Sequence, residues 1–184
     1  MFNKKESSMP KKLFSKKDIA TAVKRLALSI EKDFPGEEIV FICLLKGSFM
    51  FTSDLIRHIR NPSRIDFMRV SSYGNTMHSK GKITVTKDLE EDIKGKNVVI
   101  VEDIIDSGLT LKSIRAMIQK RKPKSLKVCA LIDKRARRKA KIEGDYIGFT
   151  IDDGFVVGYG IDYAEQYRNR PDICIIEKRH NAGK

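Results

Sequence analysis

The chain has 184 residues, of which 41% are hydrophobic and 33% are charged, and this balance excludes a disordered chain and predicts a globular protein. No apolar run is long enough to cross a bilayer, and the basic start of the chain lacks the apolar segment of a secretory signal, so we expect neither a membrane-spanning nor a secreted protein. The formal net charge of +13 at pH 7 favours anionic partners, but aromatic residues do not interleave with the basic ones, which argues against single-strand nucleic-acid binding.

The cysteine count indicates the compartment. There are three cysteines, an odd number without the paired spacing of a metal site. All lie in apolar, strand-like segments, so we expect free buried thiols and a cytoplasmic location. The residues are Cys43, Cys129 and Cys174.

The pattern of apolar residues predicts a loose basic tail over residues 1–12 and one domain over 13–184. In chain order, the expected elements are a helix over 17–33, a strand over 39–45, a helix over 49–59, a strand over 66–72, a polar loop over 73–82, a return strand over 82–86, a strand over 98–101, a helix over 109–121, a strand over 126–132, and short strands over 147–151, 155–157 and 173–176. Helices that alternate with continuous apolar strands predict an α/β fold with a parallel sheet covered on both faces.

The stretch VVIVEDIIDSGLTLKSI, from Val98 to Ile114, carries three acids at the end of an apolar strand. Its turn of small and hydroxyl residues leads into a helix N-terminus, where free backbone N–H groups suit a phosphate. Glu102 and Asp103 would repel a bare phosphate, so we expect them to face sugar hydroxyls or a magnesium ion. The alternative is a helix N-cap at Asp106 or Ser107 beside surface acids, which would leave two of the acids without a purpose.

The same stretch resembles the phosphoribosyl-pyrophosphate motif of type I phosphoribosyltransferases, in which an acid pair and an apolar pair precede a D-(S/T)-G-x-T phosphate loop. Four further segments follow the order of the hypoxanthine and hypoxanthine-guanine branch of that family, from about residue 13 to about residue 178: LLKGSFMF, RVSSYGN, LIDKR and GFVVGYGIDYAEQYRN. The resemblance implies the type I phosphoribosyltransferase fold, with a central, mostly parallel sheet flanked by helices. It also implies a mobile active-site loop and a small hood built from terminal segments, mainly from about 150–184.

The reaction that the resemblance implies is magnesium-dependent transfer of the 5-phosphoribosyl group from phosphoribosyl pyrophosphate to N9 of hypoxanthine, and of guanine. The products are inosine or guanosine monophosphate and pyrophosphate, as in purine salvage, and the family's members are homodimers or homotetramers. Asp106 would be the general base at purine N7, because a carboxylate can accept a ring proton within hydrogen-bond reach.

The resemblance also assigns binding roles. The ribose and its 5′-phosphate would be bound by Glu102, Asp103, Asp106, Ser107, Gly108, Leu109 and Thr110. Pyrophosphate would be bound by Lys46, Gly47 and Arg168, with a cis peptide bond before Lys46. The purine would be bound by Lys134, Phe155, Val156 and Asp162, under a lid headed by Ser72 and Tyr73. Magnesium would be bound by Glu102, Asp103 and Asp162.

Other interpretations of these segments remain open. Without the resemblance, Lys134 in its basic run is typical of surface charge, Phe155 and Val156 of a core, and residues 73–82 of a hairpin. A regulator that binds nucleic acid with the same fold would explain the charge, but the chain retains every expected catalytic residue and lacks a helix-turn-helix pattern. A transferase for another oxo base, such as xanthine or uracil, is a third possibility, and the Lys134 and Phe155 segments favour a purine.

Overall fold

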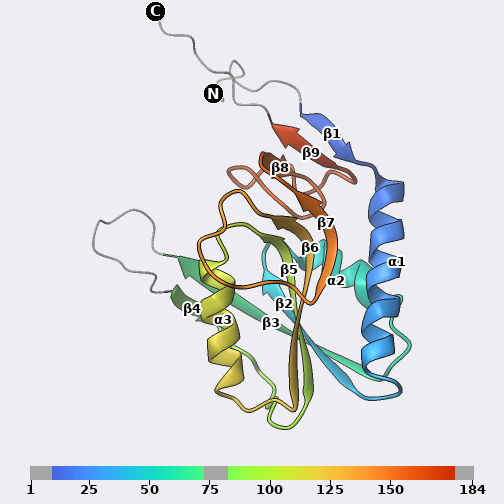
Figure 1. Ribbon diagram of the computed structural model, residues 1–184, viewed down its shortest axis with the longest axis vertical. Helices are drawn as coiled ribbons and strands as arrows, with labels where there is room; N and C mark the ends of the chain where they lie inside the picture. The colour runs from blue at the N-terminus through green and yellow to red at the C-terminus, as the bar shows by residue number, and fades with distance from the viewer. Residues whose placement is uncertain (1–9, 73–82, 177–184) are drawn as a thin grey trace, which may run out of the picture.

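The protein is represented by a computed structural model that describes residues 10–72 and 83–176 (Figure 1). Its helices are α1 (Lys16–Asp33), α2 (Phe49–Ile56) and α3 (Leu109–Gln119). Its strands are β1 (Lys11–Phe14), β2 (Ile39–Leu45), β3 (Ser63–Ser72), β4 (Ile83–Lys87), β5 (Asn97–Ile105), β6 (Ser125–Lys134), β7 (Tyr146–Ile151), β8 (Phe155–Val157) and β9 (Ile173–Ile176). Within the described ranges, no helix is long and apolar enough to cross a membrane.

The strands form two sheets. The larger has the order β4-β3-β2-β5-β6-β7, in which only β4 runs antiparallel to its neighbour. The smaller has the order β1-β9-β8 and is antiparallel throughout. It combines the two ends of the described chain at the top of Figure 1 and is called the hood below. The predicted α/β fold, with a mostly parallel sheet and a hood from terminal segments, is confirmed.

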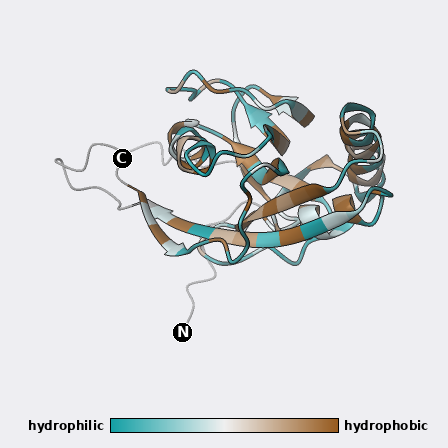
Figure 2. Cartoon of the chain, turned by 90° about the horizontal axis from the view of Figure 1, so that it is seen from below, coloured by the Kyte–Doolittle hydropathy of each residue, from teal (hydrophilic) through white to brown (hydrophobic). Residues whose placement is uncertain are grey.

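Helices cover both faces of the large sheet, and each face has its own core. On one face, α1 and α2 pack on strand residues such as Phe41 and Val99. On the other, α3 packs on their chain neighbours, such as Val40 and Ile100. A strand whose two faces are both covered needs apolar residues at every position, which is why β2 and residues 98–101 of β5 are continuous apolar runs. Figure 2 shows this as strands that are mostly brown in the interior of the sheet.

The predicted elements exist, but several boundaries are wrong. The expected loose tail is too long, because Lys11 and Lys12 lie in β1 and pair with Ile175 and Cys174 of β9. Two strands extend beyond their apolar runs: β5 continues through the acid pair to Ile105, and β6 continues to Lys134, because their backbones go on pairing with each other and with β7. The backbone pairing of a polar stretch leaves no mark in its side-chain pattern.

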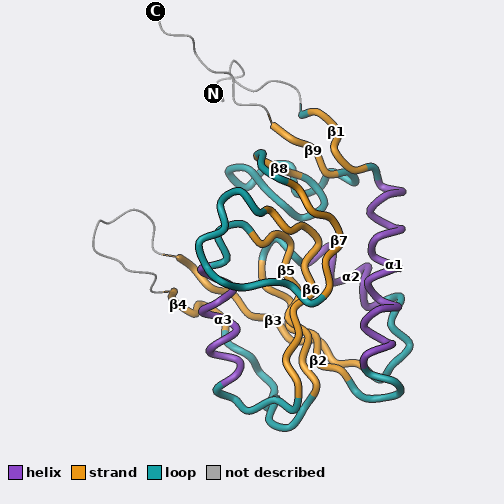
Figure 3. Tube along the Cα trace, viewed as in Figure 1, coloured by secondary structure: helices purple, strands orange, loops and turns teal. Residues whose placement is uncertain are grey.

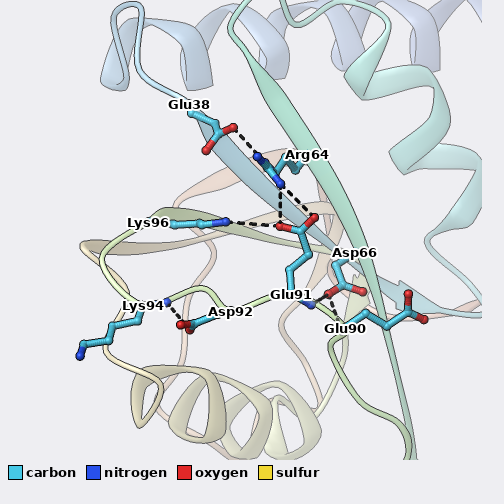
Figure 4. Close-up of polar contacts among 8 residues, drawn as sticks. All are labelled: Glu38, Arg64, Asp66, Glu90, Glu91, Asp92, Lys94 and Lys96. Atoms are coloured by element: carbon cyan, nitrogen blue, oxygen red, sulfur yellow. Dashed lines mark hydrogen bonds and ion pairs between the residues drawn. The ribbon is translucent and has the colours of Figure 1, made fainter.

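A buried carboxylate fastens the segment before β5 to the large sheet (Figure 4). Asp66, on β3, is 4% exposed. Its Oδ2 accepts the backbone N–H groups of Glu90 and Glu91 at 2.8 and 3.0 Å, and its Oδ1 accepts that of Phe67 at 2.7 Å. All three of these partners are backbone N–H groups of the protein itself, so we assign Asp66 a structural function.

Replacement of Asp66 by alanine is expected to lower the free energy of unfolding by about 2–3 kcal/mol, because buried N–H groups lose their charged acceptor. Asp92 is a matched control, since it is exposed and accepts a single N–H, from Lys94, at 2.9 Å. Its replacement by alanine should cost less than about 1 kcal/mol. Denaturant unfolding of the two variants measures the difference, and equal losses would contradict the anchoring role of Asp66.

Candidate active site

Three predicted segments meet at the carboxyl ends of adjacent parallel strands. Lys46 follows β2, the acid pair lies near the end of β5, and Lys134 ends β6, and these strands are neighbours in the sheet. Ligands of open α/β sheets bind at this edge. In Figure 3 the loops gather there, between the sheet and the hood. The fold thus brings together residues that are up to 88 positions apart in the sequence, Lys46 and Lys134.

The turn between β5 and α3 is open to a ligand. The N-cap of α3 is Gly108, with a left-handed backbone (φ 75°) and no side-chain cap, so the alternative of an N-cap at Asp106 or Ser107 is wrong. A cavity of about 110 Å³ lies against this turn. It is lined by Glu102, Ile104, Ile105, Asp106, Ser107, Gly108, Thr110 and Leu111. Leu109 is exposed beside it.

A neighbouring segment holds the turn from behind. The backbone N–H groups of Lys139 and Ala140 donate to the carbonyl oxygen of Ser107 at 2.9 and 3.1 Å. The guanidinium of Arg138 donates to the carbonyl oxygens of Asp106 and Ile105 at 3.1 and 3.2 Å. Arg138 was not among the predicted site residues, because nothing in a basic run distinguishes a side chain that turns inward from one that faces solvent.

The acid pair contacts the turn after β2. The Leu45–Lys46 peptide bond is cis, as the resemblance implies. A Cβ atom at Gly47 would overlap the carboxylate of Asp103, and one at Gly160 would overlap the carbonyl oxygen of Gly47. Only glycine therefore allows the acid pair, the Lys46 turn and the segment after β8 to approach one another this closely.

The surroundings of Glu102 disfavour the ionised form of its carboxyl group. Burial and the negative charge of the adjacent Asp103 carboxylate raise the pKa of Glu102 well above its usual value. The Glu102 carboxyl group therefore binds its proton more tightly in the folded protein than in the unfolded chain. The free energy of unfolding accordingly falls as the pH rises through the raised pKa.

Replacement of Glu102 by glutamine is expected to raise the melting temperature by a few degrees at pH values above this raised pKa, in the absence of ligands and divalent cations. The gain should disappear at pH values below the usual range of glutamate, where both proteins are uncharged at this position. Glu143→Gln is the control, since Glu143 is exposed. Melting curves across pH measure the effect, and a gain that does not depend on pH would contradict it.

The carboxylate of Asp106 faces the ammonium of Lys134. Lys134 Nζ lies 3.3 Å from Asp106 Oδ2, 3.5 Å from Asp153 Oδ1 and 3.1 Å from the carbonyl oxygen of Gly154. The Lys134 side chain is 5% exposed, so its interpretation as surface charge is wrong. Asp106 Oδ1 is buried and has no hydrogen-bond partner among the described residues. It is therefore an acceptor whose hydrogen-bonding capacity is not used by the described residues.

An aromatic residue, Phe155, directly follows Gly154, whose carbonyl oxygen accepts from Lys134. Phe155, on β8, is 37% exposed and meets the ring of Tyr163 edge to face, with centroids 5.1 Å apart. Its interpretation as a core residue is wrong, whereas Val156 is buried as expected and pairs with Ile175 of β9. An exposed ring face at the mouth of a site can stack on a flat base.

Both predicted pyrophosphate cations contact acids. Arg168 NH2 lies 2.7 Å from Asp162 Oδ1 and 3.3 Å from Glu165 Oε2, and Lys46 Nζ lies 2.9 Å from the same Glu165 oxygen. Glu165 was not among the predicted site residues, because one acid in a polar turn carries no sequence signal. Arg168 Nε is buried and has no partner within the described ranges.

The predicted metal ligands do not form one cluster. Across residues 10–72 and 83–176, no group of three or more acidic, histidine or cysteine side chains could hold a metal ion. Asp162 is paired with Arg168. Glu102 and Asp103, however, are adjacent oxygen donors whose mutual repulsion a cation would relieve. They fit magnesium, which is bound through one or two carboxylates together with water and substrate oxygens.

The lid segment is described only in part. Ser72 ends β3 and pairs with Ile83 of β4, whereas Tyr73 lies outside the described residues. The lid stays a prediction.

The three cysteines are free and buried, as predicted.

Comparison with known proteins gives a consistent result. The sequence profile of the phosphoribosyl transferase domain matches residues 11–164. The hypoxanthine-guanine phosphoribosyltransferase of Aquifex aeolicus is 46% identical over 91% of this chain and 94% of its own length. The hypoxanthine phosphoribosyltransferase of Salmonella typhimurium is 52% identical over 75% of this chain and 78% of its own.

Solved structures agree. A crystal structure of a hypoxanthine-guanine phosphoribosyltransferase from Bacillus anthracis, with a HEPES molecule in the active site, superposes with a TM-score of 0.89. It is 52% identical and covers 92% of this chain and all of its own. The hypoxanthine phosphoribosyl transferase of Trypanosoma cruzi, studied for the role of its C-terminal region in oligomeric state and activity, has a TM-score of 0.87 at 38% identity, over 96% of this chain and 95% of its own.

Proposed function

The chain belongs to the phosphoribosyl transferase family, and from this membership we propose that it transfers the 5-phosphoribosyl group of phosphoribosyl pyrophosphate to N9 of hypoxanthine and of guanine. The products are inosine or guanosine monophosphate and pyrophosphate, and the pathway is purine salvage. The observation that carries the purine assignment is the contact of Asp106 with the buried ammonium of Lys134, together with the exposed ring of Phe155.

Asp106 and Lys134 have different roles towards the purine: Asp106 accepts a proton and Lys134 donates a hydrogen bond. Lys134 holds Asp106 Oδ2, which leaves Oδ1 as the acceptor for the proton of purine N7 while N9 attacks C1 of the ribose. Lys134 donates to the 6-oxo group of the purine, exchanging one of its present acceptors for it. A 6-amino group would place a donor against a donor, so adenine is rejected.

The remaining residues serve the phosphoribosyl donor. The displacement builds positive charge on the ribose and negative charge on the leaving pyrophosphate, so Lys46 and Arg168 bind pyrophosphate as its charge grows. Backbone N–H groups of the Ser107–Thr110 turn bind the 5′-phosphate. Glu102 and Asp103 accept the ribose hydroxyls, and Ser72 and Tyr73 head the lid that excludes water.

A magnesium ion is proposed as the cofactor. It would be held by Glu102 and Asp103 on the ribose side and by Asp162 near the pyrophosphate, and when bound it would neutralise charge on the leaving group. The donor set supports this, because all three side chains offer the carboxylate oxygens that magnesium prefers.

A panel of bases tests the function. Hypoxanthine, guanine, xanthine and adenine are each incubated with phosphoribosyl pyrophosphate and magnesium, and nucleotides are separated by chromatography. We expect inosine and guanosine monophosphate and no product from adenine. Failure to form inosine monophosphate would reject the proposal, and xanthine as the best substrate would favour the other-oxo-base alternative. The nucleic-acid-binding alternative rests on net charge alone and predicts a salt-dependent gel shift.

We also propose a homo-oligomer located in the cytoplasm. Ile65 and Phe67 alternate on β3 with the buried Asp66 and Met68, so both project from the opposite face, where each is 40% exposed. Exposed apolar side chains on one sheet face suit contact with a second copy. Sedimentation of the wild-type protein should give the mass of a dimer or tetramer, and Phe67→Asp should lower that mass.

The proposed cytoplasmic location is supported by the three free thiols, which suit a reducing compartment.

A further inference from the structure

One carboxylate oxygen bridges the two cations assigned to pyrophosphate. Glu165 Oε2 accepts from Lys46 Nζ at 2.9 Å and lies 3.3 Å from Arg168 NH2. The two cations come from distant parts of the chain, the turn after β2 and the segment after β8. A single anionic oxygen held between a lysine and an arginine is the arrangement that an oxygen of a bound phosphate would also adopt.

The turn that carries Glu165 has an unusual backbone. Ala164, Glu165 and Tyr167 all have positive φ angles, of 50°, 63° and 72°. The left-handed region costs a residue other than glycine roughly 1 kcal/mol or more. The turn is held by the N–H of Glu165, which donates to Asp162 Oδ2 at 2.8 Å. Strained backbone persists only while its contacts maintain it, so replacing the contacts of Glu165 favours another conformation of the turn.

The contacts of Glu165 are also weak enough to be exchanged. Its side chain is 65% exposed and that of Lys46 is 45% exposed, and ion pairs in water contribute only up to about 1 kcal/mol. Arg168 is incompletely satisfied, because its buried Nε has no partner among the described residues. A ligand with several oxygens could use donors that one carboxylate does not reach.

We propose that Glu165 is an internal stand-in for the leaving pyrophosphate. In the free protein its carboxylate neutralises Lys46 and shares Arg168 with Asp162. Pyrophosphate, or the pyrophosphate group of the substrate, displaces it from both cations, and the carboxylate returns as the product leaves. Glu165 thus competes with pyrophosphate for the same donors and speeds its release.

This inference rests on the proposed function, since it takes Lys46 and Arg168 as the pyrophosphate cations. It also predicts the sign of the change in pyrophosphate affinity when Glu165 is replaced, which the assignment of Lys46 and Arg168 alone does not. An ordinary contact residue weakens binding when it is removed, whereas a competitor strengthens it. Loss of the Glu165 charge should therefore tighten the binding of pyrophosphate.

The test is calorimetric titration of magnesium pyrophosphate into the wild-type protein and into Glu165→Gln. We expect the variant to bind about two to five times more tightly, the free-energy range of an exposed ion pair. The difference should shrink as salt is added, because screening weakens the internal competitor. Glu165→Asn is a second variant that removes the charge with a residue tolerated at positive φ, and it should tighten binding as well.

Asp152→Asn controls for the general gain of positive charge, because Asp152 is exposed on the segment before β8 and forms no ion pair with another described residue. It should leave pyrophosphate affinity unchanged. Suppose that the wild-type protein forms inosine monophosphate, but folded Glu165→Gln and Glu165→Asn bind pyrophosphate no more tightly than it does. This result would overturn the inference and leave the proposed function standing. A wild-type protein that neither binds pyrophosphate nor forms the nucleotide would instead overturn the proposed function.

Discussion

Replacement of Asp106 by asparagine is expected to lower kcat about 100- to 10,000-fold, the usual contribution of a general base. Asparagine has nearly the same shape and can keep an oxygen towards Lys134, which lies 3.3 Å from Asp106 Oδ2. It cannot take up the purine proton at Oδ1. The Michaelis constant for phosphoribosyl pyrophosphate should change little, because that substrate is bound by the backbone of the turn and by the acid pair.

Asp153 supplies the matched control. It also pairs with Lys134, at 3.5 Å, but its side chain is 52% exposed. Asp153→Asn removes the same charge from the same ammonium and should lower kcat less than about threefold, in line with the small worth of an exposed ion pair. Steady-state rates for both variants decide the matter. Unchanged turnover in Asp106→Asn, or equal losses in the two variants, would refute the assignment of the base.

Replacement of Gly47 by alanine is expected to lower kcat/KM by at least about 100-fold, since a displacement of about 1 Å at a reacting centre has this cost. The new methyl group would overlap the Asp103 carboxylate. Asp103, or the Lys46 turn, must then move. The substitution therefore disturbs both the ribose acids and the pyrophosphate cation, although alanine is chemically neutral.

Gly36→Ala separates this effect from loss of stability. Gly36 has a φ of 71°, and a Cβ atom there would meet nothing within 4 Å. The control should lose roughly 1 kcal/mol of stability from backbone strain and keep its activity. Rates and unfolding curves are measured for both variants. Full activity in Gly47→Ala would show that the close approach of Asp103 is not needed.

The sequence alone predicted the fold class because buried parallel strands require apolar residues at every position, as in residues 39–45. It also predicted the turn between a strand and a helix at residues 106–108, because small residues interrupt the apolar pattern there. It could not predict the burial of Lys134. That depends on Asp106, Asp153 and the Gly154 carbonyl group converging from different elements.

Arg138 and Glu165 were missed for the same reason. Each is one charged residue among several in its segment, and its role comes from partners far away in the chain: the carbonyl groups of Ile105 and Asp106 for the first, and Lys46 for the second. Periodicity reports which face of an element is buried. It does not report which charge crosses a loop to meet another.

The strand order of the hood has a consequence for protein synthesis. β9 lies between β1 and β8, so neither of the outer strands has a partner until residues 173–176 have left the ribosome. A chain made from its N-terminus could form the large sheet, with Asp106 and Lys134 in place, while Phe155 still lacks a fixed position. Translation that stalls before β9 should therefore leave a nascent chain with a folded core and no completed base site.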